Sequence, residues 1–119
     1  MSKRVDKPWG YEEIWAKTDQ YVGKILHIKA GHSLSLQYHK VKEETIRLSS
    51  GRMVLEVQEP EQAPKKIEMR AGDSYHIPPG TLHRMTAVEA CDVLEVSTPE
   101  LDDVVRLEDR YGRAGTSGP

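Results

Sequence analysis

Apolar and polar residues alternate with a period of two over most of this chain. In residues 24–29, Lys24, Leu26 and Ile28 alternate with Ile25, His27 and Lys29, and a similar alternation covers residues 33–39. Alternate side chains of a β-strand point to the same face, so each stretch predicts a strand. Further strands are predicted at residues 44–48, 53–58, 66–69, 74–77, 83–88 and 91–97. About eight short strands separated by Gly and Pro turns favour a β-barrel or a sandwich.

One segment near the end of the chain has helical spacing instead. The apolar residues of Glu100 to Arg110 fall on one face of a helix, which predicts a short C-terminal helix. The small residues after it predict a tail in which order ends. We therefore expect a single domain over residues 1–119, with an N-terminal arm (1–20), a barrel (about 21–99) and a C-terminal helix and tail (100–119).

Composition narrows the classes of function. The chain has 119 residues, 37% hydrophobic and 30% charged, as expected of a small soluble domain. A formal net charge of −2 gives no basis for binding nucleic acid or an anionic membrane. No apolar run approaches the roughly 20 residues of a membrane span, and the first residues do not form a secretory signal. The single cysteine, Cys91, fits a reducing compartment, so we expect a cytoplasmic protein.

Two segments framed by glycines carry metal-competent side chains. The first runs from Gly31 to Gly51 and contains Gln37, His39 and Glu44; the second runs from Gly72 to His83 through a Pro-Pro-Gly turn. Gln37 and His39 share one strand face, which is polar, whereas the opposite face carries leucines. A polar face directed into a small barrel indicates a site, and imidazole with carboxylate and amide oxygens suits Zn, Mn, Fe or Ni. The alternative is that each histidine is an ordinary polar residue on a solvated face.

The spacing of these segments resembles the two motifs of the cupin superfamily. The matching positions are Gly31, His39, Glu44, Gly51, Gly72, Pro78, Gly80 and His83. Four longer blocks look more specifically like the cupin domain of type II mannose-6-phosphate isomerase: Pro8–Tyr11, Ser33–His39, Ile77–Arg84 and Asp102–Arg113. The resemblance implies an all-β fold, a single small cupin barrel (double-stranded β-helix, or jelly roll), to which the periodicity adds the short C-terminal helix.

The same resemblance implies a metal site and an activity. The implied ligands of one divalent ion are Gln37, His39, Glu44 and His83, with zinc the first choice and Mn, Fe or Ni the alternatives. The implied reaction is the isomerisation of a sugar phosphate between aldose and ketose. It needs a base near the reacting carbons and a cation for the phosphate. His76 is a candidate base, with a structural hydrogen bond as its alternative role. Lys24 is the first candidate for the phosphate and also a catalytic candidate, Arg84 is the second for the phosphate, and solvated rim charges are the alternative for both.

Departures from the family pattern leave other functions open. Lys40, Val41 and Thr45 stand where histidines are common, and Ile25 stands where an arginine is expected. One alternative is a metal-dependent oxygenase, and the other is a non-catalytic cupin that binds a sugar or another ligand. Cupins commonly dimerise, so we expect a homodimer with a small sugar phosphate as its ligand and with no nucleic-acid or membrane partner.

Overall fold

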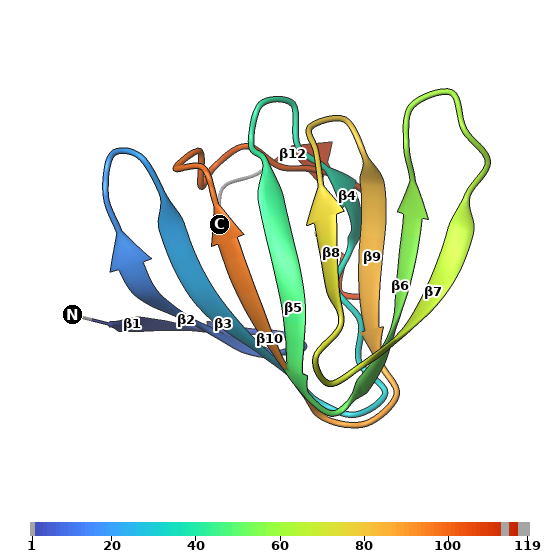
Figure 1. The fold of residues 1–119 in the computed structure, drawn as a ribbon, viewed down its shortest axis with the longest axis horizontal. Helices are drawn as coiled ribbons and strands as arrows, with labels where there is room; N and C mark the ends of the chain where they lie inside the picture. Colours follow the sequence, from blue (N-terminus) through green and yellow to red (C-terminus); the bar gives the residue numbers. More distant parts are fainter. Residues whose placement is uncertain (1, 113–114, 117–119) are drawn as a thin grey trace.

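The computed structural model describes residues 2–112 and 115–116, and over these residues the chain is entirely β-structure. Two six-stranded antiparallel sheets face each other, as the ribbon in Figure 1 shows. The first sheet has the order β1 (Lys3–Lys7), β2 (Gly10–Lys17), β3 (Val22–Ile28), β10 (Cys91–Ser97), β5 (Glu44–Ser50) and β8 (Ser74–Ile77). The second has the order β12 (Gly115–Thr116), β11 (Val105–Glu108), β4 (Leu36–Tyr38), β9 (Leu82–Ala87), β6 (Arg52–Gln58) and β7 (Lys65–Arg70).

The all-β prediction is confirmed, and each of the eight predicted strands is present as one of β3 to β10. The alternating stretch at residues 33–39 forms a ladder over Leu36–Tyr38, preceded by an isolated bridge from Ser33 to Thr86. The predicted N-terminal arm contains two strands, β1 and β2, which extend the first sheet beyond β3.

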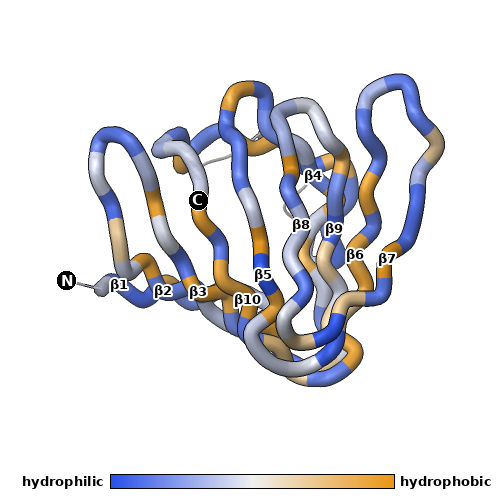
Figure 2. The backbone as a smooth tube through the Cα atoms, in the orientation of Figure 1, coloured by the Kyte–Doolittle hydropathy of each residue, from blue (hydrophilic) through white to orange (hydrophobic). Residues whose placement is uncertain are grey.

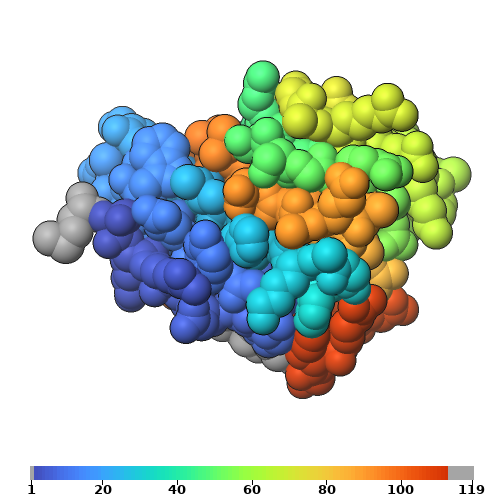
Figure 3. All heavy atoms as spheres, turned by 90° about the horizontal axis from the view of Figure 1, so that it is seen from below, coloured from blue at the N-terminus to red at the C-terminus, as the bar shows by residue number. Residues whose placement is uncertain are grey.

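The predicted C-terminal helix is wrong. Residues 105–108 form strand β11, which pairs with β4 so that Val105 lies opposite Tyr38 and Arg106 opposite Gln37. In the space-filling view of Figure 3, these C-terminal residues (red) lie beside the segment in the thirties (cyan). The β-branched pair Val104-Val105 favours a strand, and β11 supplies the hydrogen-bond partners that this side of β4 needs. Part of the predicted tail, residues 113–114 and 117–119, lies outside the described residues.

The core lies between the two sheets and is built from inward-facing aliphatic side chains. Ile46 and Leu48 of β5, Leu55 of β6 and Val93 of β10 have no measurable exposure. Figure 2 shows how apolar positions, in orange, recur down β10 and β5. Among the described residues, no helix is long and apolar enough to cross a membrane; the cytoplasmic location stays a prediction.

The inward-facing rows change character along the strands. They are apolar at one end and polar at the other, as in Ile28-Leu26-Lys24 of β3, Leu48-Ile46-Glu44 of β5, Ala87-Met85-His83 of β9 and Cys91-Val93-Glu95 of β10. The strand register aligns these rows, since Val93 lies opposite both Leu26 and Leu48, and Glu95 lies opposite Lys24. The strands therefore bury a hydrophobic core at one end of the barrel and collect charged side chains at the other.

The turn between β5 and β6 requires glycine at position 51. Gly51 has φ of 88°, and a Cβ placed there would lie 2.1 Å from the main-chain oxygen of Ala90. Gly31 has a similar φ of 79°, but a Cβ there would meet nothing within 4 Å. A substitution at Gly31 therefore introduces backbone strain alone, whereas a substitution at Gly51 introduces both backbone strain and steric overlap.

We predict that Gly51→Ala destabilises the fold far more than Gly31→Ala. The Gly31 variant should lose roughly 1–2 kcal/mol of unfolding free energy from left-handed backbone strain alone. The Gly51 variant adds a clash with a neighbouring strand, which brings the loss to about 3 kcal/mol or more. Urea denaturation of both variants measures the difference, and equal losses would contradict the proposed overlap with Ala90.

Candidate metal centre

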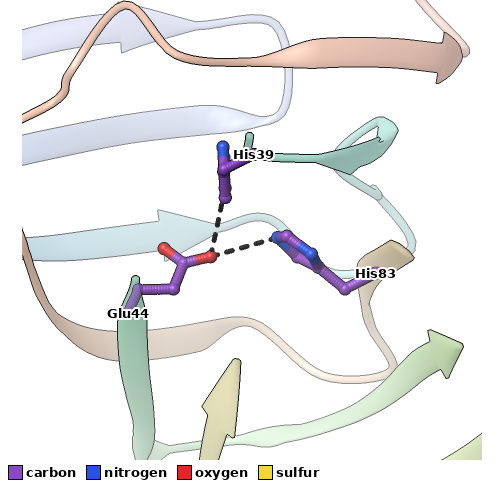
Figure 4. A group of neighbouring side chains, drawn as sticks. All are labelled: His39, Glu44 and His83. Atoms are coloured by element: carbon purple, nitrogen blue, oxygen red, sulfur yellow. Dashed lines mark ion pairs between the residues drawn. The ribbon is translucent and has the colours of Figure 1, made fainter. Parts of the chain in front are cut away.

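Three predicted ligands meet at the charged end of the barrel. His39 directly follows β4, Glu44 begins β5, and His83 is the second residue of β9. Figure 4 shows both imidazole rings turned toward the Glu44 carboxylate. Glu44 Oε1 lies 3.3 Å from His39 Nε2 and 3.1 Å from His83 Nε2. The three ligand atoms lie within 4.8 Å of one another, and all three residues are buried. Segments distant in the sequence thus converge on one point.

The far side of each ring fixes which nitrogen faces this point. His39 Nδ1 lies 2.6 Å from the main-chain oxygen of Asp103, and His83 Nδ1 lies 2.9 Å from that of Thr81. A carbonyl oxygen only accepts hydrogen bonds, so each Nδ1 carries a hydrogen and donates it. In the neutral rings, each Nε2 therefore presents a lone pair toward Glu44, which is the arrangement that metal-bound histidines adopt.

This arrangement fits a cation. The converging atoms, His39 Nε2, Glu44 Oε1 and His83 Nε2, have no hydrogen-bond partner among the described residues although each is buried. Three buried acceptors with no donor between them repel one another and lose their hydration. A divalent ion bound by these atoms removes both penalties. The residues present thus fit a metal, and two imidazoles with a carboxylate suit Zn, Mn, Fe and Ni alike.

A proton is the other cation that this point can hold. Burial lowers the pKa of His83, but the hydrogen bond and charge of Glu44 outweigh it and raise that pKa above its ordinary value. Burial raises the pKa of Glu44, yet the hydrogen bonds that the two histidines donate when a proton occupies Nε2, together with the charge of Lys42, hold it well below its ordinary value. A raised histidine pKa stabilises the fold at low pH, and this contribution is lost as pH rises through the folded value. A bound metal should therefore stabilise the protein most at higher pH, where the proton has left.

Gln37, the fourth predicted ligand, lies on the same wall. It pairs with His83 across β4 and β9 and lines the pocket that contains His39 and Glu44. Its amide oxygen accepts a hydrogen bond from the Ser35 hydroxyl at 3.0 Å. That oxygen has a second lone pair, so its role as a metal ligand stays a prediction.

A buried ion network surrounds the three ligands. Lys42 Nζ lies 3.4 Å from Glu44 Oε2 and 3.2 Å from Glu95 Oε2. Burial lowers the pKa of Lys42, but the two carboxylates outweigh it and raise that pKa above its ordinary value. Burial and the neighbouring Glu44 charge raise the pKa of Glu95. Lys42 thus stays charged and neutralises the carboxylate oxygen of Glu44 that faces away from the histidines.

Lys24, predicted to meet a phosphate, also lies in this pocket. Its ammonium group lies 3.4 Å from Glu12 Oε2, and both side chains are 7% exposed. The other oxygen of Glu12, Oε1, is buried and has no hydrogen-bond partner within the part of the chain that the structure describes. The Glu12–Lys24 pair thus places an acceptor and a cation on the pocket wall opposite β4.

The structure does not bring His76 or Arg84 into this site. His76 lies opposite Thr45 on β8, its side chain is 56% exposed, and its Nε2 contacts the Glu43 carboxylate at 2.5 Å. Arg84 follows the inward-facing His83 and therefore points outward, where it pairs with Glu56 at 2.8 Å and with Glu108 at 3.2 Å. These three contacts lie outside the site, which matches the alternative roles considered for His76, a structural hydrogen bond, and for Arg84, a rim charge.

Five charged residues that line the pocket were not predicted from the sequence: Lys7, Glu12, Lys42, Glu95 and Arg106. Glu95 could have been found from the alternation, because it is a charged residue on the inward-facing row that also contains Cys91, Val93 and Ser97 of β10. Glu12 left a weaker one in the irregular pattern of β2. Lys42 lies in a turn, where alternation carries no information on direction.

The jelly-roll fold and the buried His-Glu-His cluster are those expected of a cupin, and comparison with known proteins agrees. The family described as Cupin domain matches residues 24–97, which include the four predicted ligands. This chain therefore belongs to the cupin domain family. Its curated relatives include the mannose-1-phosphate guanylyltransferase ManC of Salmonella typhimurium, which is 30% identical over 118 residues. The alignment covers 95% of this chain and 24% of ManC, so the chain spans about a quarter of the length of that relative.

Solved structures share the fold at low sequence identity. KdgF from Halomonas sp. superposes with a TM-score of 0.73 at 19% identity, over 82% of this chain and 88% of that chain. Oxalate decarboxylase from Bacillus subtilis superposes with a TM-score of 0.80 at 16% identity, over 89% of this chain and 30% of that chain. These likenesses confirm the cupin jelly roll.

We predict that His83→Ala abolishes metal binding and leaves the barrel folded. The substitution removes one of three converging ligand atoms, whereas the apolar end of the core keeps its packing. His76→Ala is the matched control, because His76 lies outside the site. Elemental analysis of untagged protein after loading with Zn²⁺ measures the metal content, and circular dichroism checks the fold. An unchanged metal content in His83→Ala would refute the ligand assignment.

Proposed function

We propose that this chain is a metal-dependent isomerase that interconverts an aldose phosphate and a ketose phosphate of the mannose 6-phosphate type. The observation that carries the proposal is the buried His39–Glu44–His83 centre beside a pocket lined by Lys24 and Glu12. A curated relative named for mannose 1-phosphate supports a hexose phosphate as the ligand class. The isomerisation needs no co-reactant, because one proton moves from a carbon to its neighbour while a second moves between the two oxygens that those carbons carry.

Different residues of the pocket would bind the metal ion and the phosphate. A divalent ion held by His39, Glu44 and His83, with Gln37 as the proposed fourth ligand, would polarise the substrate's carbonyl oxygen. Lys24, buried on the pocket wall, would attract the phosphate or another anionic group of the ligand. Arg84 drops out of this role in our proposal, because its guanidinium is held outside by Glu56 and Glu108.

The base of the proposed reaction is Glu12 rather than His76. A base must reach the proton that it removes, and His76 points away from the pocket toward Glu43. Glu12 Oε1 is a buried acceptor with no hydrogen-bond partner among residues 2–112 and 115–116, and Glu12 lines the same pocket as His39 and Glu44. Its other oxygen is held by Lys24, which fixes the orientation of the carboxylate. Glu12 can thus carry a proton between two adjacent carbons of a bound sugar.

The direct test is turnover. Metal-loaded protein should convert mannose 6-phosphate into fructose 6-phosphate, which a coupled enzymatic assay detects. Glu12→Gln should lower kcat by about 10²- to 10⁴-fold while metal content stays unchanged. Glu13→Gln is the matched control, since Glu13 is the next residue on the same strand and points outward.

Two outcomes would overturn the proposed reaction, and a third would overturn only the choice of Glu12 as its base. Oxygen consumption on a candidate substrate without isomerisation would favour the oxygenase. Metal or sugar binding without any turnover would favour a non-catalytic binding cupin. Equal activity of Glu12→Gln and Glu13→Gln, with isomerisation intact, would remove Glu12 from the mechanism and leave the reaction standing.

We also propose that the protein is a homodimer. An apolar strip on the outer face of the first sheet supports this: Trp15 packs over Gly23, and Leu94 and Val96 are 36% and 53% exposed. Val96 lies opposite Gly23 in the ladder, so the strip is continuous across β2, β3 and β10. Exposed apolar patches of this kind mark interaction surfaces.

Light scattering tests this assembly. The wild-type protein should have twice the mass of one chain, and Val96→Lys should be a monomer because a buried lysine disfavours an apolar interface. Val88→Lys is the control, since Val88 is similarly exposed outside the strip. A wild-type monomer would contradict the proposal.

A further inference from the structure

The segment between β10 and β11 is fastened to the loop that separates two candidate metal ligands. Residues 40–43 form this loop, with His39 before it and Glu44 after it. At its far end, the Glu43 amide donates to the Thr98 hydroxyl, and the Thr98 amide donates back to the Glu43 carbonyl. The geometry of the loop therefore depends on residues that lie more than fifty positions further along the chain.

Asp103 makes the densest set of these contacts. Its Oδ1 accepts the Lys40 amide at 3.0 Å, and its Oδ2 accepts the amides of Val41 and Lys42 at 2.7 and 2.8 Å. Its main-chain oxygen accepts His39 Nδ1 at 2.6 Å. One residue thus holds four consecutive residues through four hydrogen bonds, three of them strengthened by the carboxylate charge.

These contacts act on the metal centre from both sides of the loop. The main-chain oxygen orients the His39 ring and keeps its hydrogen on Nδ1, which directs Nε2 toward Glu44. The carboxylate fixes the start of the loop at Lys40 and its continuation at Lys42, whose ammonium group bridges Glu44 and Glu95. This loop is the covalent link between His39 and Glu44, so its conformation affects how closely the two side chains approach each other.

We propose that Asp103 is a positioning residue of the metal centre: it is not a ligand, and it sets the tautomer and placement of His39. This inference rests on the proposed metal-binding function. Groups that orient metal-bound histidines typically affect metal affinity by about 10- to 100-fold. The C-terminal segment would then be part of the site and not merely a cover over the end of the barrel.

The experiment uses Co²⁺ as the probe, because its visible absorption reports ligand geometry as well as binding. Asp103→Ala, which removes all three carboxylate bonds, should weaken Co²⁺ binding by about 10- to 100-fold and alter the visible spectrum. Asp103→Asn keeps one acceptor oxygen and should lie between the wild type and Asp103→Ala. Asp102→Asn is the matched control, because it makes the same charge change at an exposed neighbour.

A second readout does not need the metal. Nitrogen-15 NMR of the imidazole rings in metal-free protein, recorded at alkaline pH, reports the tautomer of each histidine. Asp103→Ala keeps the main-chain oxygen but removes the three carboxylate bonds that hold it beside His39, so it should reduce the fraction of His39 that carries hydrogen on Nδ1. His83, held by Thr81 on another loop, should keep its tautomer and serves as the internal control for a folded protein.

The outcomes separate the two levels of inference. If the wild type binds no Co²⁺, the proposed function fails and the role of Asp103 falls with it. If the wild type binds Co²⁺ and both Asp103 variants match it in affinity, spectrum and His39 tautomer, the positioning role alone is overturned. If neither His39 nor His83 favours hydrogen on Nδ1 in Asp103→Ala, the variant has unfolded generally. The Co²⁺ affinity of Asp103→Asn then tests the positioning role: a wild-type affinity overturns it, and a weakened affinity supports it.

Discussion

The mutual repulsion of three buried acceptors is the constraint on which the rest of the site depends. Two imidazole nitrogens and a carboxylate oxygen meet at the end of a hydrophobic core, and the hydrogens of both rings are committed to main-chain carbonyls behind them. Such an arrangement is unfavourable unless a cation neutralises it. The surrounding residues offset this unfavourable electrostatic arrangement or hold its groups in place. Lys42 neutralises the second oxygen of Glu44, Asp103 holds the His39 loop, and the apolar end of the barrel keeps the strands in register.

The architecture produces this convergence by changing the inward-facing residues along each strand. The same β3, β5, β9 and β10 strands contribute aliphatic side chains at one end and polar or charged ones at the other. Packing of the aliphatic end supplies the stability that the charged end lacks, because burial of apolar surface is the main favourable contribution to folding. Because the aliphatic and charged side chains occupy different ends of one barrel, ionisable groups are buried without disrupting the packing of the hydrophobic core. Cupins of very different sequence share this barrel, as the structural likenesses at 16–19% identity show.

The strands, and the three residues His39, Glu44 and His83 that meet at the charged end, could be predicted from the sequence because alternation and glycine-framed spacing are local signals. Strand β11 was not predicted, since Leu101, Val104, Val105 and Leu107 satisfy helical spacing while the decisive factor is the hydrogen-bonding edge of β4. His76 was a candidate base, but the register of β5 and β8 places it opposite Thr45 with its side chain 56% exposed. Lys42 and the role of Asp103 were not predicted, because both depend on contacts across more than fifty residues. In each case the position of the residue depends on pairing with segments distant in the sequence and not on the local sequence pattern.

The central claim is that the three acceptors bind a divalent cation in competition with protons. The most direct measurement is the thermal unfolding of metal-free and Zn²⁺-loaded protein at about pH 6 and about pH 8, on either side of the ordinary histidine pKa. With free metal at about 100 times its Kd, linkage predicts about 2.7 kcal/mol of stabilisation, and hence a rise in Tm of roughly 10 °C. Because the pKa of His83 is raised, protons should compete at the lower pH, so the rise should be larger at the higher pH. An equal Tm with and without metal at both pH values would contradict the account.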